Sequence, residues 1–324
     1  GDLEVSWNDR ILAYSLDLRG SEYYTIHVRN IFTNEPVTEK IEETSGSILF
    51  SLDDKYIFYS KLDKNHRPRK IFKHELGKPT KNDLLIFEEK SEAFTVGIGL
   101  SSDEKYYFIT SSDHNTSEQY YFSVNETKPE PKLMQKREKG IIYSINSWGG
   151  YFYMHTNKGA EDFKIDKTND ISFVKWESYI PAKDETLIGG LTFLNNWIIR
   201  SEVTNALGKI FVKNLKNEKE EELIFSDEKV FDGGVSLVQK DKNTDLVHIS
   251  YSTPKTQSRV YLYNLKSKEK KLVKEQIIPS GHNPDDYIVE RFDCESHDGR
   301  KVPITITRHK KTNIDGNANL LLYG

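Results

Sequence analysis

The sequence contains a single cysteine, Cys294, among its 324 residues. One cysteine excludes an intramolecular disulfide framework and is typical of a protein from a reducing compartment, so we expect a cytoplasmic location. A lone cysteine is more often a small buried hydrophobe than a nucleophile. Cys294 is therefore expected to be buried, although His297 lies nearby in the sequence.

Long apolar runs and an excess of basic residues are missing as well. No stretch approaches the roughly 18 consecutive apolar residues that indicate a membrane-spanning helix. The formal net charge is −4, and the lysines are interleaved with carboxylates, whereas a nucleic-acid partner requires a basic footprint. The sequence therefore predicts neither a membrane partner nor a nucleic-acid partner.

Patterns that hold metals or phosphates are absent too. The nine histidines show no metal-ligand spacing, and neither His-Glu-x-x-His nor Cys-x-x-Cys occurs. His66 and His74, in a lysine-rich stretch, are eight residues apart. The pairs Gly149-Gly150, Gly189-Gly190 and Gly233-Gly234 lack the Lys-Ser/Thr or the helix that follows a phosphate loop. Turns and strand bends explain them better, and we predict no metal and no cofactor.

The sequence is rich in aromatic residues and it repeats itself. Aromatics make up 12% of the chain, which favours strands. Three similar stretches, Ser6–Ser15, Ser51–Ser60 and Ser101–Thr110, begin 45 and 50 residues apart, and weaker copies surround Tyr151, Trp197 and Leu246. Six copies with this period predict an all-β fold, a β-propeller of four-stranded blades. A β-sandwich is the alternative, but it does not explain the regular spacing.

The second copy shows how a blade would be built. We predict its strands at Ser47–Ser51, Lys55–Leu62, Arg69–Leu76 and Asp83–Glu88. The second strand of each copy is apolar almost continuously, which indicates burial on both faces between neighbouring blades. Because the first copy begins almost at residue 1, we expect seven blades in the parent protein, with the first missing or incomplete here.

The repeats end near Pro279, so we expect a propeller over 1–279 and a different element over 280–324. Two strands, Asp286–Glu295 and Val302–Arg308, are predicted to form a hairpin in which Asp298-Gly299 supplies the positive φ angles of the turn. The chain then ends on the apolar run Leu320–Gly324. We expect this run to be the first inner strand of a truncated α/β domain, disordered or opportunistically paired here, and the chain to be a piece of a larger protein.

These last residues also carry a family resemblance. Asp298-Gly299, Val302-Pro303, His309–Lys311, Asp315-Gly316 and the terminal Leu-Leu-Leu-Tyr-Gly resemble the propeller-to-hydrolase junction of the prolyl oligopeptidase family of serine peptidases. Within that family, the stretch from Arg69 to Lys90 is similar to a blade of the oligopeptidase B (protease II) branch.

The resemblance implies that the propeller gates the active site and filters substrates by size, while the parent protein hydrolyses short peptides after Lys or Arg. The implied partners are short peptides and the chain's own α/β-hydrolase domain. A hinge is expected near Pro279–Tyr287. Post-proline cleavage, a free-standing propeller that acts as a binding module, and a propeller enzyme with carboxylates around its axis are the alternatives.

No catalytic residue can be assigned in this chain. Family members carry the nucleophile in a Gly-x-Ser-x-Gly elbow. Ser101 and Ser236 have a glycine two residues before them, but Asp103 and Val238 follow two residues after. No serine fits the elbow, so the resemblance implies a triad beyond Gly324 and an inactive isolated chain.

Acidic clusters offer the only candidates for selecting a basic substrate. They are Glu88-Glu89, Glu220–Glu222 and Asp285-Asp286. Adjacent like charges on surface loops are usually solvated, so we expect these to be solvated too. By resemblance, the selecting carboxylates belong mainly to the missing domain.

Overall fold

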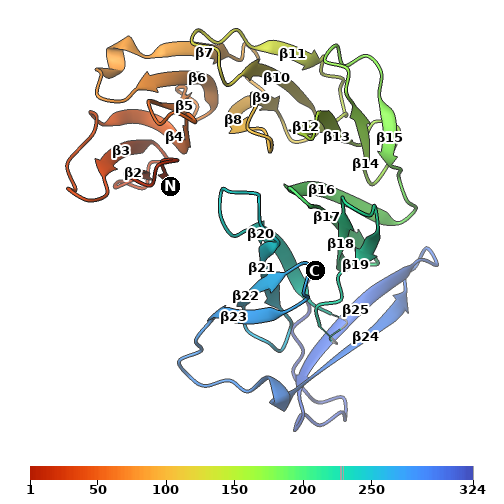
Figure 1. The fold of residues 1–324 in the computed structure, drawn as a ribbon. Helices are drawn as coiled ribbons and strands as arrows, with labels where there is room; N and C mark the ends of the chain where they lie inside the picture. The colour runs from red at the N-terminus through yellow and green to blue at the C-terminus, as the bar shows by residue number, and fades with distance from the viewer. Residues whose placement is uncertain (227, 229, 324) are drawn as a thin grey trace. The chain divides into compact units, whose positions relative to one another are not determined.

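The computed structural model describes every residue except 227, 229 and 324, and consists almost entirely of antiparallel strands (Figure 1). The described residues contain no α-helix and two 3-10 helices, η1 (Thr80–Asn82) and η2 (Pro284–Asp286). None of the described helices has the length and apolar character needed to cross a membrane. The chain divides into two compact units, Gly1–Pro181 and Ala182–Gly324.

Unit 1 contains four four-stranded repeats, in which strands pair antiparallel in chain order. The first two repeats share strand β4 and so form one seven-stranded sheet. The strands are β1 (Leu3–Val5), β2 (Ile11–Leu16), β3 (Tyr24–Asn30), β4 (Ile41–Phe50), β5 (Tyr56–Leu62), β6 (Pro68–Glu75), β7 (Leu84–Glu88), β8 (Thr95–Leu100), β9 (Tyr106–Ser112), β10 (Ser117–Ser123), β11 (Lys132–Gln135), β12 (Tyr143–Trp148), β13 (Tyr151–Thr156), β14 (Lys164–Thr168) and β15 (Glu177–Ile180).

Strand β4 serves two repeats because it bends in its middle. Its first residue, Ile41, pairs with β3, and its last residue, Phe50, pairs with β5. Gly46 stands at the bend with a φ of 91°, and a Cβ at this position would lie 2.9 Å from the ring of Tyr24. Only glycine fits both this backbone angle and this close approach.

Unit 2 contains two further four-stranded sheets and a separate two-stranded hairpin. Its strands are β16 (Thr186–Leu194), β17 (Trp197–Thr204), β18 (Leu207–Asn214), β19 (Glu220–Glu222), β20 (Asp232–Leu237), β21 (Leu246–Ser252), β22 (Arg259–Asn264), β23 (Lys270–Glu275), β24 (Tyr287–Glu295) and β25 (Lys301–His309). The predicted hairpin is therefore present as β24 and β25.

The turn of this hairpin differs from the prediction. Only Gly299 has a positive φ, of 79°. The amide of Gly299 donates to the carbonyl of Ser296, and the amide of Ser296 donates to the carbonyl of Arg300. These bonds define a three-residue loop with glycine at its end, so Asp298 keeps an ordinary backbone angle.

The first three repeats join their first two strands through the same turn. The hydroxyl of Ser51 donates to Oδ1 of Asp53 (2.7 Å) and accepts the N–H of Tyr56 (3.0 Å). The equivalent serines, Ser6 and Ser101, accept the N–H five residues on at 2.9 and 3.0 Å. All three serines are buried. The repeated serine in the sequence therefore marks a structural anchor.

Each apolar core lies between two consecutive repeats. The core between the second and third repeats takes residues from β5–β7 and from β8–β10, namely Phe58, Ile71, Ile86, Val96, Tyr107, Ile109 and Phe122. Similar cores join the first repeat to the second, the third to the fourth, and the fifth to the sixth. Buried residues run continuously along much of β5, β9 and β17, as predicted, whereas β2, β13 and β21 alternate.

Most predicted strands of the second repeat agree with the structure. Strands β5, β6 and β7 lie within one residue of the predicted bounds at each end. The prediction for the first strand was too short, because β4 begins at Ile41 and also closes the preceding repeat. The first repeat has all four of its strands, β1–β4.

One prediction near the C-terminus was wrong, namely that Cys294 is buried. Cys294 is an exposed free thiol on β24, because this two-stranded hairpin has no further sheet over it in the described residues. Residues 320–323 form no strand and are exposed, as expected for a run that lacks its sheet neighbours in this chain; Gly324 lies outside the described residues. A strand requires a partner for its backbone groups.

We expect Ser51→Ala to destabilise the full-length protein by about 1–3 kcal/mol, because it leaves the partly buried N–H of Tyr56 without its acceptor. Urea unfolding followed by fluorescence measures the change. The control is Ser47→Ala, an exposed serine of the same repeat, which should change stability by less than about 0.5 kcal/mol. Equal effects of the two substitutions would contradict the anchoring role of Ser51.

Candidate functional site

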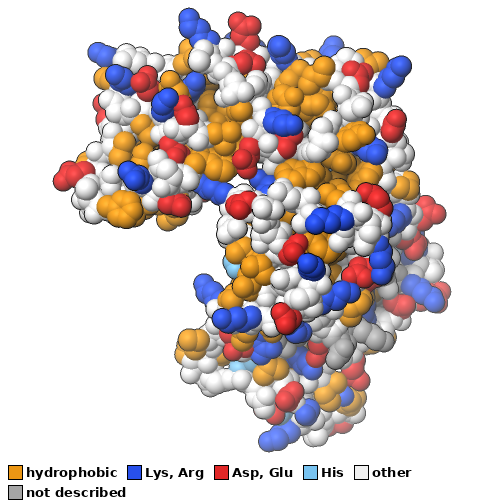
Figure 2. All heavy atoms as spheres, in the orientation of Figure 1, with side chains coloured by type: hydrophobic (Ala, Val, Ile, Leu, Met, Phe, Trp, Pro, Cys, Tyr) orange, Lys and Arg blue, Asp and Glu red, His pale blue; other side chains and the backbone are white. Residues whose placement is uncertain are grey.

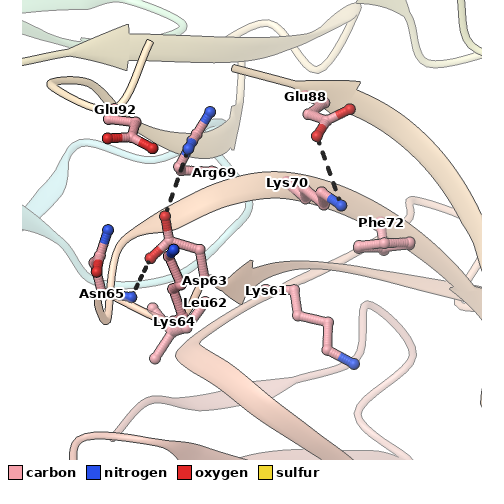
Figure 3. Close-up of a pocket in the computed structure, with 10 residues that line it drawn as sticks. All are labelled: Lys61, Leu62, Asp63, Lys64, Asn65, Arg69, Lys70, Phe72, Glu88 and Glu92. Carbon is pink, nitrogen blue, oxygen red and sulfur yellow. Dashed lines mark hydrogen bonds and ion pairs between the residues drawn. The ribbon is translucent and has the colours of Figure 1, made fainter. Parts of the chain in front are cut away.

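A hollow of about 540 Å³ lies beside the hairpin of β5 and β6 (Figure 3). Charged side chains line it, and four of them form two ion pairs: Asp63 lies 3.6 Å from Arg69, and Lys70 lies 3.6 Å from Glu88. Arg69 also donates to the main-chain carbonyl of Glu89 at 2.8 Å. These ion pairs hold the hairpin in place, and the lining offers no serine, cysteine or histidine for nucleophilic catalysis.

A hydroxyl, an imidazole and a carboxylate align between the first two repeats. His74 is fully buried, with Nδ1 2.6 Å from Oδ1 of Asp83 and Nε2 2.7 Å from Oγ1 of Thr38. Tyr59 donates to the other oxygen of Asp83 at 2.9 Å. The order of these groups is that of a catalytic triad. A histidine with no exposed surface cannot meet a substrate, so the cluster ties the loop before β4 to β6.

Burial, and after it the nearby Asp83 carboxylate, raises the pKa of Tyr59 far above its ordinary value. Tyr59 therefore keeps its proton at neutral pH and donates a hydrogen bond to Asp83. A permanent donor on one oxygen of Asp83 leaves the other oxygen for His74.

Two buried glutamates share one arginine between the second and third repeats. Glu89 follows β7 and Glu118 lies on β10; each is 4% exposed. Nη2 of Arg137 lies 2.7 Å from Oε2 of Glu89 and 2.8 Å from Oε1 of Glu118. The hydroxyl of Ser111 also donates to Glu89, and the hydroxyl of Tyr120 donates to Glu118 at 2.7 Å.

These bonds decide the charge of both glutamates. Burial acts to raise the pKa of Glu89, but the bonds from Ser111, from a backbone amide and from Arg137 outweigh it and lower the pKa. Burial acts in the same way on Glu118, and the bonds from Arg137 again lower its pKa. Both carboxylates are therefore charged at neutral pH, and Arg137 is the cation that both of them contact.

The acidic clusters of the sequence divide between structural and solvated roles. Glu89 is buried in this network, so the expectation that it is solvated was wrong. Glu220 also has a specific partner, since both of its oxygens accept from the buried Arg200, at 2.8 and 3.0 Å. Asp285 and Asp286 are exposed, as expected. Charged side chains of both signs are mixed over the face shown in Figure 2.

The other histidines and glycine pairs named in the sequence analysis do not lie together in one site. His66 precedes β6 whereas His74 lies near its end, so the two stay apart. Gly149-Gly150 forms the turn between β12 and β13 with positive φ angles, Gly189-Gly190 lies at an irregularity of β16, and Gly233-Gly234 lies within β20. No group of three or more His, Cys, Asp or Glu among the described residues could hold a metal ion.

A family comparison identifies the architecture. Residues 1–276 match the family model for the prolyl oligopeptidase N-terminal β-propeller domain. The chain belongs to the prolyl oligopeptidase family. The predicted propeller fold is thereby confirmed, and the six four-stranded repeats are its blades.

Similar proteins lie in the same family. The chain is 28% identical to dipeptidyl aminopeptidase BI of Pseudoxanthomonas mexicana, covering 100% of this chain and 45% of that protein. It is also 28% identical to protease 2 of Moraxella lacunata, covering 97% and 45%. The solved structure of oligopeptidase B from Trypanosoma brucei with covalently bound antipain matches with a TM-score of 0.88 and 26% identity, over 97% of this chain and 45% of that one. The chain thus spans about half the length of these relatives.

We expect Arg137→Met to destabilise the full-length protein by about 3 kcal/mol at pH 7, because it leaves two buried carboxylates without a cation. The loss should shrink as the pH falls below about 4.3, the ordinary pKa of Glu. The folded wild-type protein holds the pKa values of Glu89 and Glu118 low. The stability that their bonds to Arg137 contribute is therefore lost as the pH falls through these lowered pKa values. In the variant, protonated glutamates no longer need the arginine.

Urea unfolding at pH 7 and at pH 4 measures both effects. The control is Lys158→Met, which removes an exposed ion pair with Glu138 and should cost less than about 1 kcal/mol at either pH. A loss that stays constant between pH 7 and pH 4 would contradict the electrostatic role of Arg137.

Proposed function

We propose that this chain is the propeller domain of a serine peptidase like oligopeptidase B, whose full-length form hydrolyses short peptides after Lys or Arg. The observation that supports this most is the likeness to Trypanosoma brucei oligopeptidase B, at 26% identity over 97% of the chain. The sequence contains no Gly-x-Ser-x-Gly elbow, so the role proposed for the chain itself is steric.

In this proposal the propeller covers the active site. A covered site excludes bulk water and folded proteins, so that only short peptides reach the triad. The partners are short peptides and the chain's own α/β-hydrolase domain, and the location is cytoplasmic. The parent propeller is proposed to have seven blades, of which six are present in this chain.

We place the end of the propeller at residue 279 and assign 280–324 to the connection and the start of the hydrolase domain. The last strand of the sixth repeat ends at Glu275, and β24 begins at Tyr287. Between them lie only irregular backbone and the short η2, with a positive φ of 80° at Gly281. This segment is the proposed hinge, because few backbone bonds would oppose its rotation.

A second activity has its own support. The relative that matches 100% of the chain at 28% identity is a dipeptidyl aminopeptidase, which favours release of dipeptides from a free N-terminus. Post-proline cleavage is a third hypothesis, since the chain is 21% identical to a prolyl endopeptidase of Elizabethkingia meningoseptica. A free-standing propeller that binds partners, and an enzyme with carboxylates around the propeller axis, are the remaining alternatives.

Three fluorogenic amides separate these activities in the full-length protein: a blocked arginyl amide, a blocked prolyl amide, and a dipeptidyl amide with a free amine. We expect kcat/KM for the arginyl amide to exceed that for the prolyl amide at least about 100-fold, because a site built to pair with a guanidinium leaves its carboxylates unpaired with proline. A preference for the free amine would favour the dipeptidyl activity instead.

The 324-residue chain on its own is expected to cleave none of these amides. Circular dichroism of the same sample establishes that the strands are folded. Cleavage of the arginyl amide by the pure chain would contradict the assignment of a purely steric role. Trace proteases must first be removed from the sample, and a control with a serine-protease inhibitor accompanies the assay.

A further inference from the structure

Strand β8 has an open edge and lacks side chains at two positions. It is the terminal strand of its sheet, since only β9 pairs with it in the described chain. In Figure 1, β8 lies on the inner side of the arc along which the sheets of unit 1 follow one another. Its sequence is Thr-Val-Gly-Ile-Gly-Leu, with glycine at 97 and 99.

The backbone groups at this edge are available for pairing. The amide of Ser101 donates to the carbonyl of Tyr106, which marks a hydrogen-bonded pair, and such pairs alternate along an antiparallel ladder. Gly99 and Gly97 therefore bond to β9. The N–H and C=O groups of the residues between and beside them, above all Ile98, point to the open edge. An extended peptide could add to this edge as a further strand.

The two glycines also create a hollow on one face of β8. A Cβ built on Gly97 or Gly99 would meet nothing within 4 Å, and neither glycine has a positive φ, so a side chain could be accommodated at either position. In the preceding repeat, Leu49 stands where Gly99 stands here, 50 residues earlier, and it packs against the core between the second and third repeats. Gly99 thus leaves unoccupied a position at which the preceding repeat has the side chain of Leu49.

The hollow has a volume of about 400 Å³, enough for a side chain as large as that of phenylalanine. Its lining contains no charged residue and consists of Gly97, Ile98, Gly99, Leu100, Phe108, Thr110, Gln119, Ser144, Ile145 and Asn146.

The polar groups of the lining are mostly used already. Gln119 donates to the hydroxyl of Thr110 at 3.2 Å and accepts from the amide of Ile145 at 2.7 Å. Asn146 donates to Ser102 at 2.8 Å. A charged side chain in the hollow would lose water without gaining a partner, whereas an apolar side chain would contact Phe108.

We propose that the open edge of β8 and this hollow form a binding site for an extended peptide. The peptide backbone pairs with β8, and one uncharged apolar or aromatic side chain enters the hollow over Gly97 and Gly99. The binding site itself does not depend on the proposed peptidase function. Only the statement that the bound peptide is a substrate rests on that function. It selects a residue other than the Lys or Arg at the cleaved bond, because the hollow does not accept a charge.

The test uses the full-length protein and a photo-cross-linking peptide. The probe is an acetylated and amidated pentapeptide, Ala-Val-X-Val-Ala, with benzoylphenylalanine at X. After irradiation, digestion and mass spectrometry, we expect cross-links on the segments that contain Phe108 and Ile145. An unlabelled peptide with Phe at X should compete at least 10-fold better than one with Asp at X.

Gly99→Val fills the hollow and should lower the cross-link yield at least 10-fold. Gly99→Ala fills it in part and should lower the yield less. The matched control is Gly208→Val on β18, where a Cβ also meets nothing within 4 Å, and this variant should cross-link like the wild type. Because valine favours strands, neither valine variant should melt at a lower temperature.

The outcomes separate this site from the proposed activity. Cross-links that map elsewhere, or a yield that Gly99→Val does not reduce, overturn the site while leaving the peptidase activity standing. Cross-links in the hollow of a protein that cleaves none of the fluorogenic amides support the site as a peptide-binding surface without that activity. A loss of binding in Gly208→Val equal to that in Gly99→Val would also overturn it.

Discussion

The structure depends on one constraint: a four-stranded sheet with two apolar faces cannot be stable alone, so each blade must stack on the next. The core between the second and third repeats shows this, because Phe58 and Ile71 of one blade pack with Tyr107 and Phe122 of its neighbour. Stacking is non-directional, however, and does not fix how two sheets are aligned. Polar contacts across each seam supply that alignment.

These polar contacts differ from seam to seam in unit 1. Thr38 meets the buried His74 between the first and second repeats, and Arg137 meets Glu89 between the second and third. Between the third and fourth, Ser147 donates to Asp103 at 2.6 Å. Each contact satisfies groups that the stacked sheets bury, so a sheet that slipped along its neighbour would leave them unpaired. The cores hold the blades together, and the polar contacts determine one arrangement.

The sequence predicted the features that are local and repeated, and missed those that depend on distant partners. Three of the four strands of the second repeat were predicted to within one residue, because a period of 45 to 50 residues aligns six versions of one unit. No sequence pattern indicated the role of Arg137, because its partner Glu89 lies 48 residues away in the chain. Cys294 was wrongly expected to be buried, because a residue type carries no information on whether a sheet covers its strand. Gly97 and Gly99 were visible in the sequence, but only the structure shows that nothing fills the space beside them.

The apolar cores between the repeats also limit the routes by which a peptide could reach β8. Parting the second and third repeats would expose seven buried side chains, at a cost of roughly 10–20 kcal/mol when each side chain contributes about 1.5–3 kcal/mol. That cost matches or exceeds the entire stability of a typical domain, about 5–15 kcal/mol. The seam between the second and third repeats is therefore no route for a peptide. A peptide can reach the hollow over Gly97 and Gly99 without any such separation, since it lies at the open edge of β8.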